Sequence, residues 1–309
     1  MTKRRIFFGL FFCVCFISFV FCLYKAYSGL QDVKKRQAAL EKRKIAWSSL
    51  ERAMRSKLNS FSGNAGIIVE DLKMGWRISL NEDKLFPSAS MVKIPIMAAC
   101  LRAVRDKKIS LGAKMVLKAS HKTEGSGVLK NKPVGSKFTV DKLIELMITK
   151  SDNTAANMLI GLLGFEYLND FFKSEGLEHT NLSRKMMDFR HRKQGVENYT
   201  TAEDISFILE KIYRKRFINR RVSEKCLGLL LNQKVNDRIP RKLPQDVLVA
   251  HKTGLERNVC HDAGIVFTDQ GHFLICVLTK SRSGTRKVKE FISDISLYIY
   301  NTYERMPVS

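Results

Sequence analysis

Strand-like and helix-like segments follow one another along this chain in an order that restricts how it can fold. In residues 66–81, the strand-like runs GIIVEDL and WRISLN flank the turn KMG, which predicts a β-hairpin. Three more strand-like runs, DVLVAHKTG, CHDAGIVFT and HFLICVLTKS, lie near the other end of the chain. We therefore expect an α+β fold in which one antiparallel sheet is assembled from both chain ends, with a helical insertion between them.

Helical periodicity is clear before, between and after these strand-like runs. It predicts one helix that carries Ser90 and Lys93, and further helices at residues 30–60, 153–175, 200–215 and 285–303. Thr201 lies at the start of one of them and is the residue type that favours an N-cap. Residues 177–200 lack periodicity and predict a long loop, and residues 101–150 predict a mixture of helix and loop.

The N-terminus carries a hydrophobic segment of membrane-spanning length. Residues 6–24 contain no charged side chain, and 19 residues match the thickness of a bilayer core. An uncleaved anchor is favoured over a secretory signal, although AYS at residues 26–28 offers an imperfect cleavage site. The resulting division is an anchor or signal at residues 1–28, a basic helical stalk at 29–44 and a globular domain at 45–309.

The charge of the chain is unusually positive. It has 54 lysines and arginines against 30 acidic residues, a formal net charge of +24. Such an excess favours anionic surroundings, such as acidic lipid headgroups, an anionic cell-envelope polymer or nucleic acid. The basic residues are scattered without interleaved aromatic side chains, so nucleic-acid binding is the least favoured of these.

Seven cysteines are present, and no two are spaced as CxxC, which disfavours a zinc site. Four of them lie far apart in apolar contexts, where buried free thiols are expected. They are Cys100, Cys226, Cys260 and Cys276. An exported domain would allow disulfides, but the sequence alone predicts no pairing.

Three short motifs carry the residues of a candidate active site. Ser90 and Lys93 form a Ser-x-x-Lys pair whose three-residue spacing puts both side chains on one helical face. A serine hydroxyl is a poor nucleophile until a base removes its proton, and a lysine desolvated among apolar neighbours is such a base. Taken singly, a Ser-x-x-Lys pair occurs by chance more often than by function.

The second motif is Ser151-Asp152-Asn153, between two predicted helices. Its hydroxyl is suited to relaying a proton and its amide to orienting a lysine, although helix capping alone also explains the motif. The third motif, Lys252-Thr253-Gly254, ends a predicted edge strand. Its side chains are suited to binding a carboxylate, although a solvated turn is the simpler interpretation.

In this order and spacing, the three motifs resemble those of the class A β-lactamase family of penicillin-recognising serine enzymes. The resemblance extends over residues 45–303, with further similar stretches in FPSASMVK, SDNTAANMLIGLLG, ENYTTAEDI and HDAGIVFT. It implies the β-lactamase/transpeptidase-like fold and acyl transfer from a β-lactam or a D-Ala-D-Ala-like peptidoglycan amide. It implies no metal and no organic cofactor.

The resemblance also implies a role for each motif residue. Ser90 would be the acylated nucleophile and Lys93 its proton partner. Ser151 would pass a proton to the departing nitrogen, and Asn153 would orient Lys93 and the substrate amide. The substrate-binding residues would be Lys252 and Thr253 for the carboxylate, Gly254 for close approach, and the N–H groups of Ser90 and Leu255 for the oxyanion.

One element of the family pattern is not evident. Class A β-lactamases use a glutamate on the loop after the SDN helices to activate the water that releases the acyl-enzyme. Aligned on SRKMMDF, this position holds Arg190, which cannot act as a base near neutral pH. Asp188 is the nearest acid, Glu197 is expected to pack the loop, and an alignment shifted by a few residues remains open.

Three functions therefore remain open from the sequence. The first is a membrane-anchored β-lactamase-like hydrolase facing the periplasm or the cell exterior, or secreted if the N-terminal segment is cleaved. The second is a penicillin-binding peptidase, transpeptidase or slowly deacylating sensor. The third is a non-catalytic protein that binds the cell wall or the membrane. The intact set of motif residues favours an enzyme.

Overall fold

The computed structural model describes residues 2–307, with side chains described from residue 19 onward. Its body is organised by a five-stranded antiparallel sheet in the order β2-β1-β9-β8-β7. These strands are β1 (Asn64–Asp71), β2 (Arg77–Leu80), β7 (Val249–Glu256), β8 (Val259–Val266) and β9 (Phe273–Lys280). Strand β1 pairs with β9 along its whole length. The expected α+β fold, with a sheet assembled from both chain ends, is confirmed.

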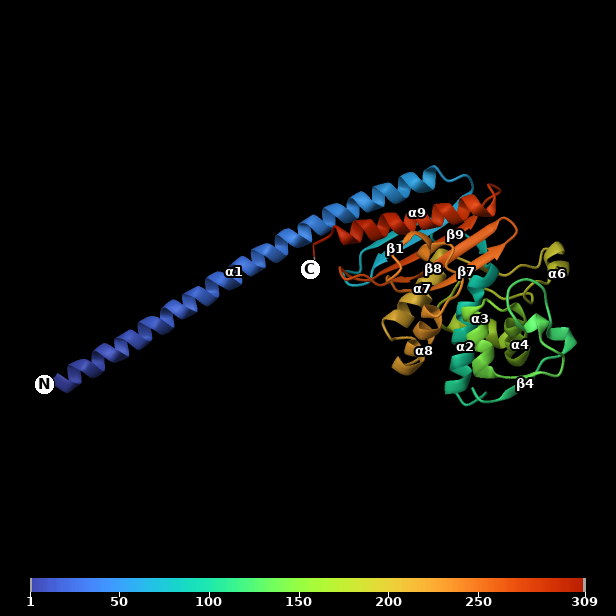
Figure 1. The fold of residues 1–309 in the computed structure, drawn as a ribbon, viewed down its shortest axis with the longest axis horizontal. Coiled ribbons are helices and arrows are strands. Elements are labelled where there is room, and N and C mark those ends of the chain that lie inside the picture. The colour runs from blue at the N-terminus through green and yellow to red at the C-terminus, as the bar shows by residue number, and fades with distance from the viewer. Residues whose placement is uncertain (1, 308–309) are drawn as a thin grey trace.

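The segment between β2 and β7 forms a mainly helical lobe beside the sheet (Figure 1). Its α-helices are α2 (Lys93–Arg105), α3 (Val140–Thr149), α4 (Asn153–Leu163), α5 (Phe165–Ser174), α6 (Phe189–Lys193), α7 (Ala202–Tyr213) and α8 (Arg220–Leu231). Its shorter elements are β3 (Phe86–Pro87), η1 (Ala89–Val92), β4 (Lys114–Val116), η2 (Ala119–His121), η3 (Leu129–Asn131), β5 (Lys137–Thr139), β6 (Tyr199–Thr200) and η4 (Ile239–Lys242).

The two faces of the sheet belong to two separate cores. Ile67 and Val69 of β1 point into one core, and Ile68 between them points into the other, as the two-residue period of a strand requires. The first core is completed by α1 (Thr2–Asn59) and α9 (Thr285–Glu304), and the second by the helical lobe. Because both faces are covered, the central strands are apolar on both sides.

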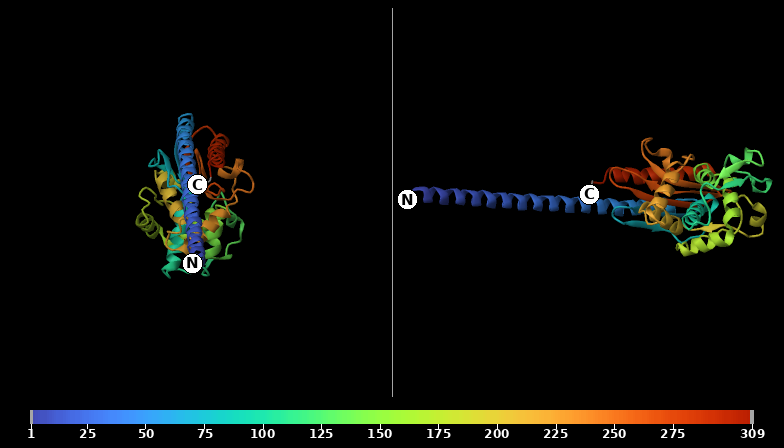
Figure 2. Two further views of the ribbon diagram at one scale, coloured as in Figure 1. Left: turned by 90° about the vertical axis from the view of Figure 1, so that its left-hand side faces the viewer. Right: turned by 90° about the horizontal axis from the view of Figure 1, so that it is seen from below.

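Helix α1 is a long rod whose C-terminal part packs on the body while the rest extends away from it (Figures 1 and 2). Trp47, Leu50 and Met54 lie three or four residues apart and are buried against the sheet and α9. Just after α1, Phe61 stacks on Phe291 of α9. This part of α1 is therefore packed as an integral part of the body.

Most predicted elements are present. The hairpin is β1 and β2, the terminal helix is α9, and Thr201 caps α7 by accepting a hydrogen bond from the Asp204 N–H. Helix α8 was not predicted, and Ser90 lies in the 3₁₀ turn η1 rather than in the α-helix that begins at Lys93. The predicted loop at residues 177–200 contains the short helix α6 and strand β6.

The predicted membrane anchor is only partly covered by the description. Its residues 6–18 lie outside the part of the chain whose side chains are described. In the described residues, no helix meets the length and hydropathy needed to cross a membrane. The backbone of the segment is helical and continuous with the rest of α1.

Cys100, Cys226, Cys260 and Cys276 are free and buried, as expected. Burial raises the pKa of the Cys100 and Cys226 thiols to about 12, which keeps both in the thiol form at neutral pH. These residues therefore contribute to packing.

A buried ion pair joins α1 to the sheet. Arg43 donates to the Asp71 carboxylate at 2.7 Å, and both side chains are fully buried. The Arg43 guanidinium also lies over the Tyr303 ring and donates to the Gln270 carbonyl. Asp71 in turn accepts from the N–H groups of the turn that follows β1. The pair therefore connects α1, at the point where its exposed part ends, to the hairpin of β1 and β2.

We expect Arg43→Ala to lower the free energy of unfolding by about 3–5 kcal/mol, because Asp71 would stay buried without its counter-charge. Arg55→Ala, which removes an exposed pair with Glu51 on the same helix, should cost less than about 1 kcal/mol. Urea unfolding of the full chain in a neutral detergent would measure both. Equal effects of the two substitutions would contradict the importance of the buried pair.

Candidate active site

The segment that carries Ser90 is held between the sheet and the long loop. Strand β3 just before it pairs with β6, and the Ser88 N–H donates to the Asn198 carbonyl at 2.7 Å. Ala89 has a positive φ of 45°, an uncommon conformation for a residue with a side chain. This backbone turn presents Ser90 at the start of the helix. Within the described residues the Ser90 hydroxyl has no hydrogen-bond partner, so it is free to rotate toward a reacting group.

His261 supports the same segment from the sheet. Its Nδ1 accepts from the Thr279 N–H at 2.9 Å, so its Nε2 carries the proton and donates to the Pro87 carbonyl at 2.9 Å. Burial lowers the pKa of His261 to about 4, which keeps the imidazole neutral in this bridging role. A neutral histidine thus ties β8 and β9 to the strand that precedes Ser90.

Lys93 is fully buried at the first position of α2. Its ammonium donates to the Ser151 carbonyl at 2.7 Å and to Asn153 Oδ1 at 2.7 Å, and lies 3.3 Å from Ser151 Oγ. Burial lowers its pKa to about 7, although the charges of Asp152 and Glu256 oppose that effect. Lys93 is therefore able to change its protonation state near neutral pH, as a general base must.

The Ser151 hydroxyl lies between two lysines. Lys252 donates to Ser151 Oγ at 2.9 Å and to the Thr253 carbonyl at 2.8 Å. Burial, followed by repulsion from Lys93 and Arg238, holds the pKa of Lys252 well below its usual value, against the attraction of Asp262. Ser151 has a positive φ of 52°, so the turn itself is shaped to bring this hydroxyl to both lysines.

The structure brings together residues that lie far apart in the sequence. Ser151 and Asn153 both accept hydrogen bonds from Lys93 of α2. Ser151 also accepts one from Lys252 of β7. The helix-capping interpretation of the SDN motif also holds, because Asp152 is the N-cap of α4 and accepts from the Ala155 N–H. The same motif therefore serves both purposes, with the capping residue between the two that face Lys93.

Asp152 also fixes a neighbouring loop. One of its carboxylate oxygens accepts from the N–H groups of Val128 and Leu129 at 2.6 and 2.9 Å. Gly127 lies against this carboxylate, and a Cβ there would come within 2.3 Å of it. The Asn153 amide donates to the Glu124 carbonyl at 3.1 Å. Residues 124–129 are thereby held against the SDN turn.

The Lys252-Thr253-Gly254 motif lies on β7, which is an edge strand as expected. Gly254 packs against η1, where a Cβ would lie 3.2 Å from both Met91 and His261. A side chain here would push Met91 and His261 aside by a few tenths of an ångström, so a glycine favours this close approach of β7 to the Ser90 segment. Leu255 is exposed next to it. The predicted carboxylate-binding and oxyanion roles of these residues remain predictions.

The structure does not bring Arg190 to this cluster. Arg190 lies exposed on α6, at the periphery of the body (Figure 1). The loop is instead held to α4 at Met186, whose N–H and carbonyl both bond to the Asn157 amide, one turn after Asn153. Arg190 lies away from the position that the sequence alignment gave it, because these hydrogen bonds to the Met186 backbone fix the loop. The alignment compared side chains and did not include such bonds.

Met187 is the loop side chain beside the SDN turn. A Cβ at Gly125 would lie within 3.2 Å of the Met187 thioether and 2.7 Å from the Asn153 amide nitrogen. The acids of the loop are engaged elsewhere. The Asp188 carboxylate caps α6 and bonds to His191, and these hydrogen bonds lower its pKa despite the opposing effect of burial.

Glu197 belongs to a buried network of two arginines and two glutamates. It pairs with Arg184 at 2.5 Å and with Arg192 at 2.8 Å. Both arginines also reach Glu256, which follows the substrate-binding motif on β7. The network joins the two ends of the loop to the edge strand, in agreement with the expectation that Glu197 packs the loop. Glu256 was missed because its partners lie about 60 to 70 residues earlier in the sequence.

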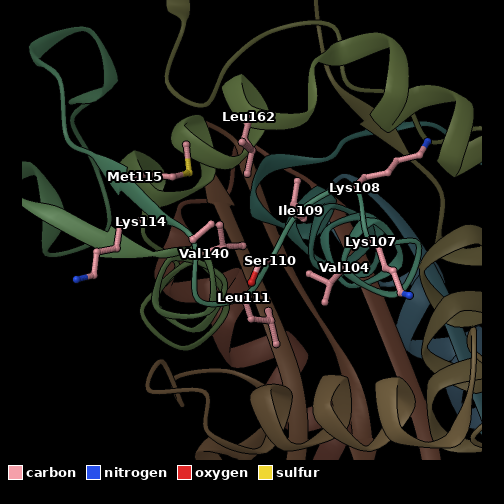
Figure 3. Close-up of a pocket in the computed structure, with 11 residues that line it drawn as sticks. Val104, Lys107, Lys108, Ile109, Ser110, Leu111, Lys114, Met115, Val140 and Leu162 are labelled. Atoms are coloured by element: carbon pink, nitrogen blue, oxygen red, sulfur yellow. The ribbon is translucent and has the colours of Figure 1, made fainter.

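A hollow on the helical lobe is lined by none of the motif residues (Figure 3). Its volume is about 790 Å³. Its lining combines apolar side chains with three lysines at its margin, namely Val104, Ile109, Leu111, Met115, Val140, Leu162, Lys107, Lys108 and Lys114. Ser110 is also part of the lining, but its hydroxyl accepts a hydrogen bond from the Gly112 N–H, and none of the three motifs reaches the hollow, so it is not a candidate active site.

Comparison with known families agrees with this geometry. A sequence profile described as the beta-lactamase enzyme family matches residues 49–303. Among characterised relatives, the β-lactamase BRO-1 of Moraxella catarrhalis is 26% identical over 238 residues, which cover 73% of this chain and 74% of that protein. A β-lactamase of Streptomyces albus G is 28% identical over 230 residues, 71% of this chain and 73% of that one.

Solved structures show the same similarity. The β-lactamase from Sphaerobacter thermophilus superimposes with a TM-score of 0.77 at 31% identity, covering 85% of this chain and 99% of that one. PBP-A gives a TM-score of 0.77 at 27% identity, covering 83% and 96%. A mutant of PBP-A, in which a leucine is replaced by glutamate, is similar to the same degree and was solved as an acyl-enzyme complex with penicillin G.

The buried Asp152 carboxylate should matter more to the site than an exposed helix cap. We expect Asp152→Ala to cost at least about 3 kcal/mol of unfolding free energy and to speed amide exchange at Val128 and Leu129, which lose their acceptor. Asp141→Ala is the matched control, because Asp141 is an exposed carboxylate in the first turn of α3. Urea unfolding and hydrogen exchange measure the two effects. Unchanged exchange at both amides would contradict this role.

Proposed function

The chain belongs to the β-lactamase enzyme family, and we infer that it is a serine hydrolase whose Ser90 is acylated by β-lactams. The observation that carries this inference is the buried Lys93, which lies one helical turn from Ser90 and has a pKa near 7. A neutral lysine in that place is able to accept the proton of the attacking hydroxyl. The names of the relatives support β-lactams as the substrate class.

The proposed reaction uses the cluster as follows. Ser90 Oγ attacks the lactam carbonyl while its proton passes to Lys93, and a tetrahedral oxyanion forms. In this proposal the N–H groups of Ser90 and Leu255 stabilise that oxyanion. The C–N bond then breaks, and the ring nitrogen takes a proton through Ser151, which leaves the acyl group as an ester on Ser90. Lys252 and Thr253 hold the substrate carboxylate.

The protonation of Lys93 gives the acylation step a pH dependence. Protonated Lys93 cannot accept a proton, so the acylation rate should rise about tenfold per pH unit below 7 and level off above it. Labelling of the full chain by a fluorescent penicillin, followed by intact-mass spectrometry at several pH values, measures this rate. Ser90→Ala is the control and should give no adduct. A rate that still rises steeply from pH 8 to 10 would contradict the assignment of Lys93 as the base.

The release step is proposed to be slow, which keeps a penicillin-binding or sensing function as the second candidate. The loop side chain beside the SDN turn is the thioether of Met187, and Met186 is the residue held by Asn157. The carboxylates of Asp188 and Glu197 are bound to His191 and to Arg184 and Arg192, respectively. Within residues 180–200, which the structure describes, neither of these two carboxylates is left unpaired to activate a water.

A carboxylate introduced next to Asn153 should shorten the lifetime of the acyl-enzyme. We expect either Met186→Glu or Met187→Glu to speed release at least tenfold, because a general base contributes about 10²–10⁴ to a rate. Arg190→Glu is the matched control on the exposed helix α6 and should leave the lifetime unchanged. A time course of adduct mass after removal of free penicillin decides this. Rapid release by the unmodified chain would overturn the slow-release proposal and favour an efficient β-lactamase.

The location of the body is also part of the proposal. The uncharged residues 6–24 support an anchor in the cytoplasmic membrane of a bacterium, and the long α1 would hold the body away from the bilayer on its outer side. We expect the full chain to resist carbonate extraction and its body to be cleaved by protease added to spheroplasts. Recovery in the soluble fraction, or protection from that protease, would contradict the proposed location.

A further inference from the structure

A cavity adjoins the candidate active site on the side of the SDN turn. Its volume is about 450 Å³, and it lies between the loop at 118–132 and the loop at 184–193. Its lining residues are Lys122, Thr123, Glu124, Lys130, Met187 and Phe189. Asn153 donates to the Glu124 carbonyl, and Met187 lies beside the same amide. A group bound in the cavity is therefore next to a residue that bonds directly to Lys93.

The cations of this cavity lack strong partners. Lys122 is half-buried as a residue, and its ammonium has no hydrogen bond or ion pair in the part of the chain that the structure describes. Lys130 has only a loose contact of 3.6 Å with Glu124, whose side chain is 89% exposed. A half-buried cation without a counter-charge loses part of its hydration and recovers it when an anion binds.

The surrounding loops add to the positive potential. Residues 118–132 contain four lysines and one glutamate. Residues 184–193 contain five lysines or arginines and one aspartate, and two of these five, Arg184 and Arg192, are paired with Glu197 and Glu256. The two loops lie close enough to interact, because Lys118 from one and Lys185 from the other add to burial in lowering the pKa of His121. Anions approaching the cavity are attracted by both loops.

The opposite wall of the cavity is apolar. Met187 and the half-exposed Phe189 come from the loop at 184–193 and line the same cavity as the lysines of the other loop. This combination of a hydrocarbon wall and unpaired ammonium groups suits a substituent with an apolar part and a negative charge. A neutral apolar substituent would fill the same space but leave Lys122 without a partner.

From these contacts we propose that the site prefers acyl donors whose acyl substituent carries a negative charge, with Lys122 as the residue that recognises it. The proposal rests on the function proposed above and specifies its substrate class. Lys122 contributes to binding the donor and takes no part in the transfer of protons at Ser90. This binding role would explain part of the excess positive charge of the chain.

Benzylpenicillin and its α-carboxy derivative test this directly, because they differ only by a carboxylate on the acyl substituent. We expect the full chain, in a neutral detergent at low salt, to be acylated about fivefold faster by the α-carboxy compound. The preference should decrease as ionic strength rises. Intact-mass spectrometry of the Ser90 adduct measures the second-order rate for each penicillin.

Two variants distinguish recognition by Lys122 from a general effect of the positive charge of the loop. Lys122→Met keeps the hydrocarbon stem but removes the ammonium, so the ratio of the two rates should fall toward one. Lys132→Met removes an exposed lysine of the same loop that does not line the cavity, and should leave the ratio unchanged. An equal drop in both variants would overturn Lys122 as the recognising residue, because it would reflect only the loss of one charge.

The remaining outcomes are also distinct. Equal acylation by both penicillins in the unmodified chain would overturn the charge preference while leaving the proposed function intact. A preference that Lys122→Met does not change would likewise exclude this cavity as its origin. Absence of any adduct with either penicillin would overturn the proposed function and, with it, this inference.

Discussion

The structure of the site depends on two buried lysines that meet at one serine hydroxyl. Lys93 and Lys252 both lie within hydrogen-bond distance of Ser151, and neither has a carboxylate in direct contact. Removing two ammonium groups from water at so short a separation disfavours both charges, so at least one lysine is driven toward its neutral form. A neutral amine beside a serine is the basis of the nucleophilic catalysis that we propose for Ser90. The remaining features of the fold bring these groups together and keep water from the cluster.

Three independent elements must converge for that contact to exist. Helix α2 begins at Lys93, the SDN turn precedes α4, and β7 forms the edge of the sheet. Each is fixed by its own buried polar anchor. His261 holds the segment before Ser90 to the sheet, Asp152 holds the turn to its neighbouring loop, and Glu256 ties the end of β7 to the arginines of the long loop. The cluster is therefore held in place from the sheet, the neighbouring loop and the long loop.

Much of this arrangement was predictable from sequence. The period-two strands at both chain ends determined the sheet, and the residues of the three motifs are found in contact through Lys93, Ser151, Asn153 and Lys252. The anchors were harder to predict. Arg184 and Glu256 pair across 72 residues, and no local pattern marks such a contact. Arg190 was misplaced because the loop is held by backbone hydrogen bonds to Asn157, which side-chain similarity does not register.

The proposed acylation mechanism requires Lys93 to be neutral for part of the time near pH 7. Its pKa is measurable directly in the full chain by NMR of lysine labelled with ¹³C at the ε position and ¹⁵N at the amine, with Lys93→Arg to assign the signal. The account predicts a titration near pH 7, about three units below an exposed lysine. A midpoint near 10.5 would contradict it, because Lys93 would then stay charged and Ser90 would lack its base.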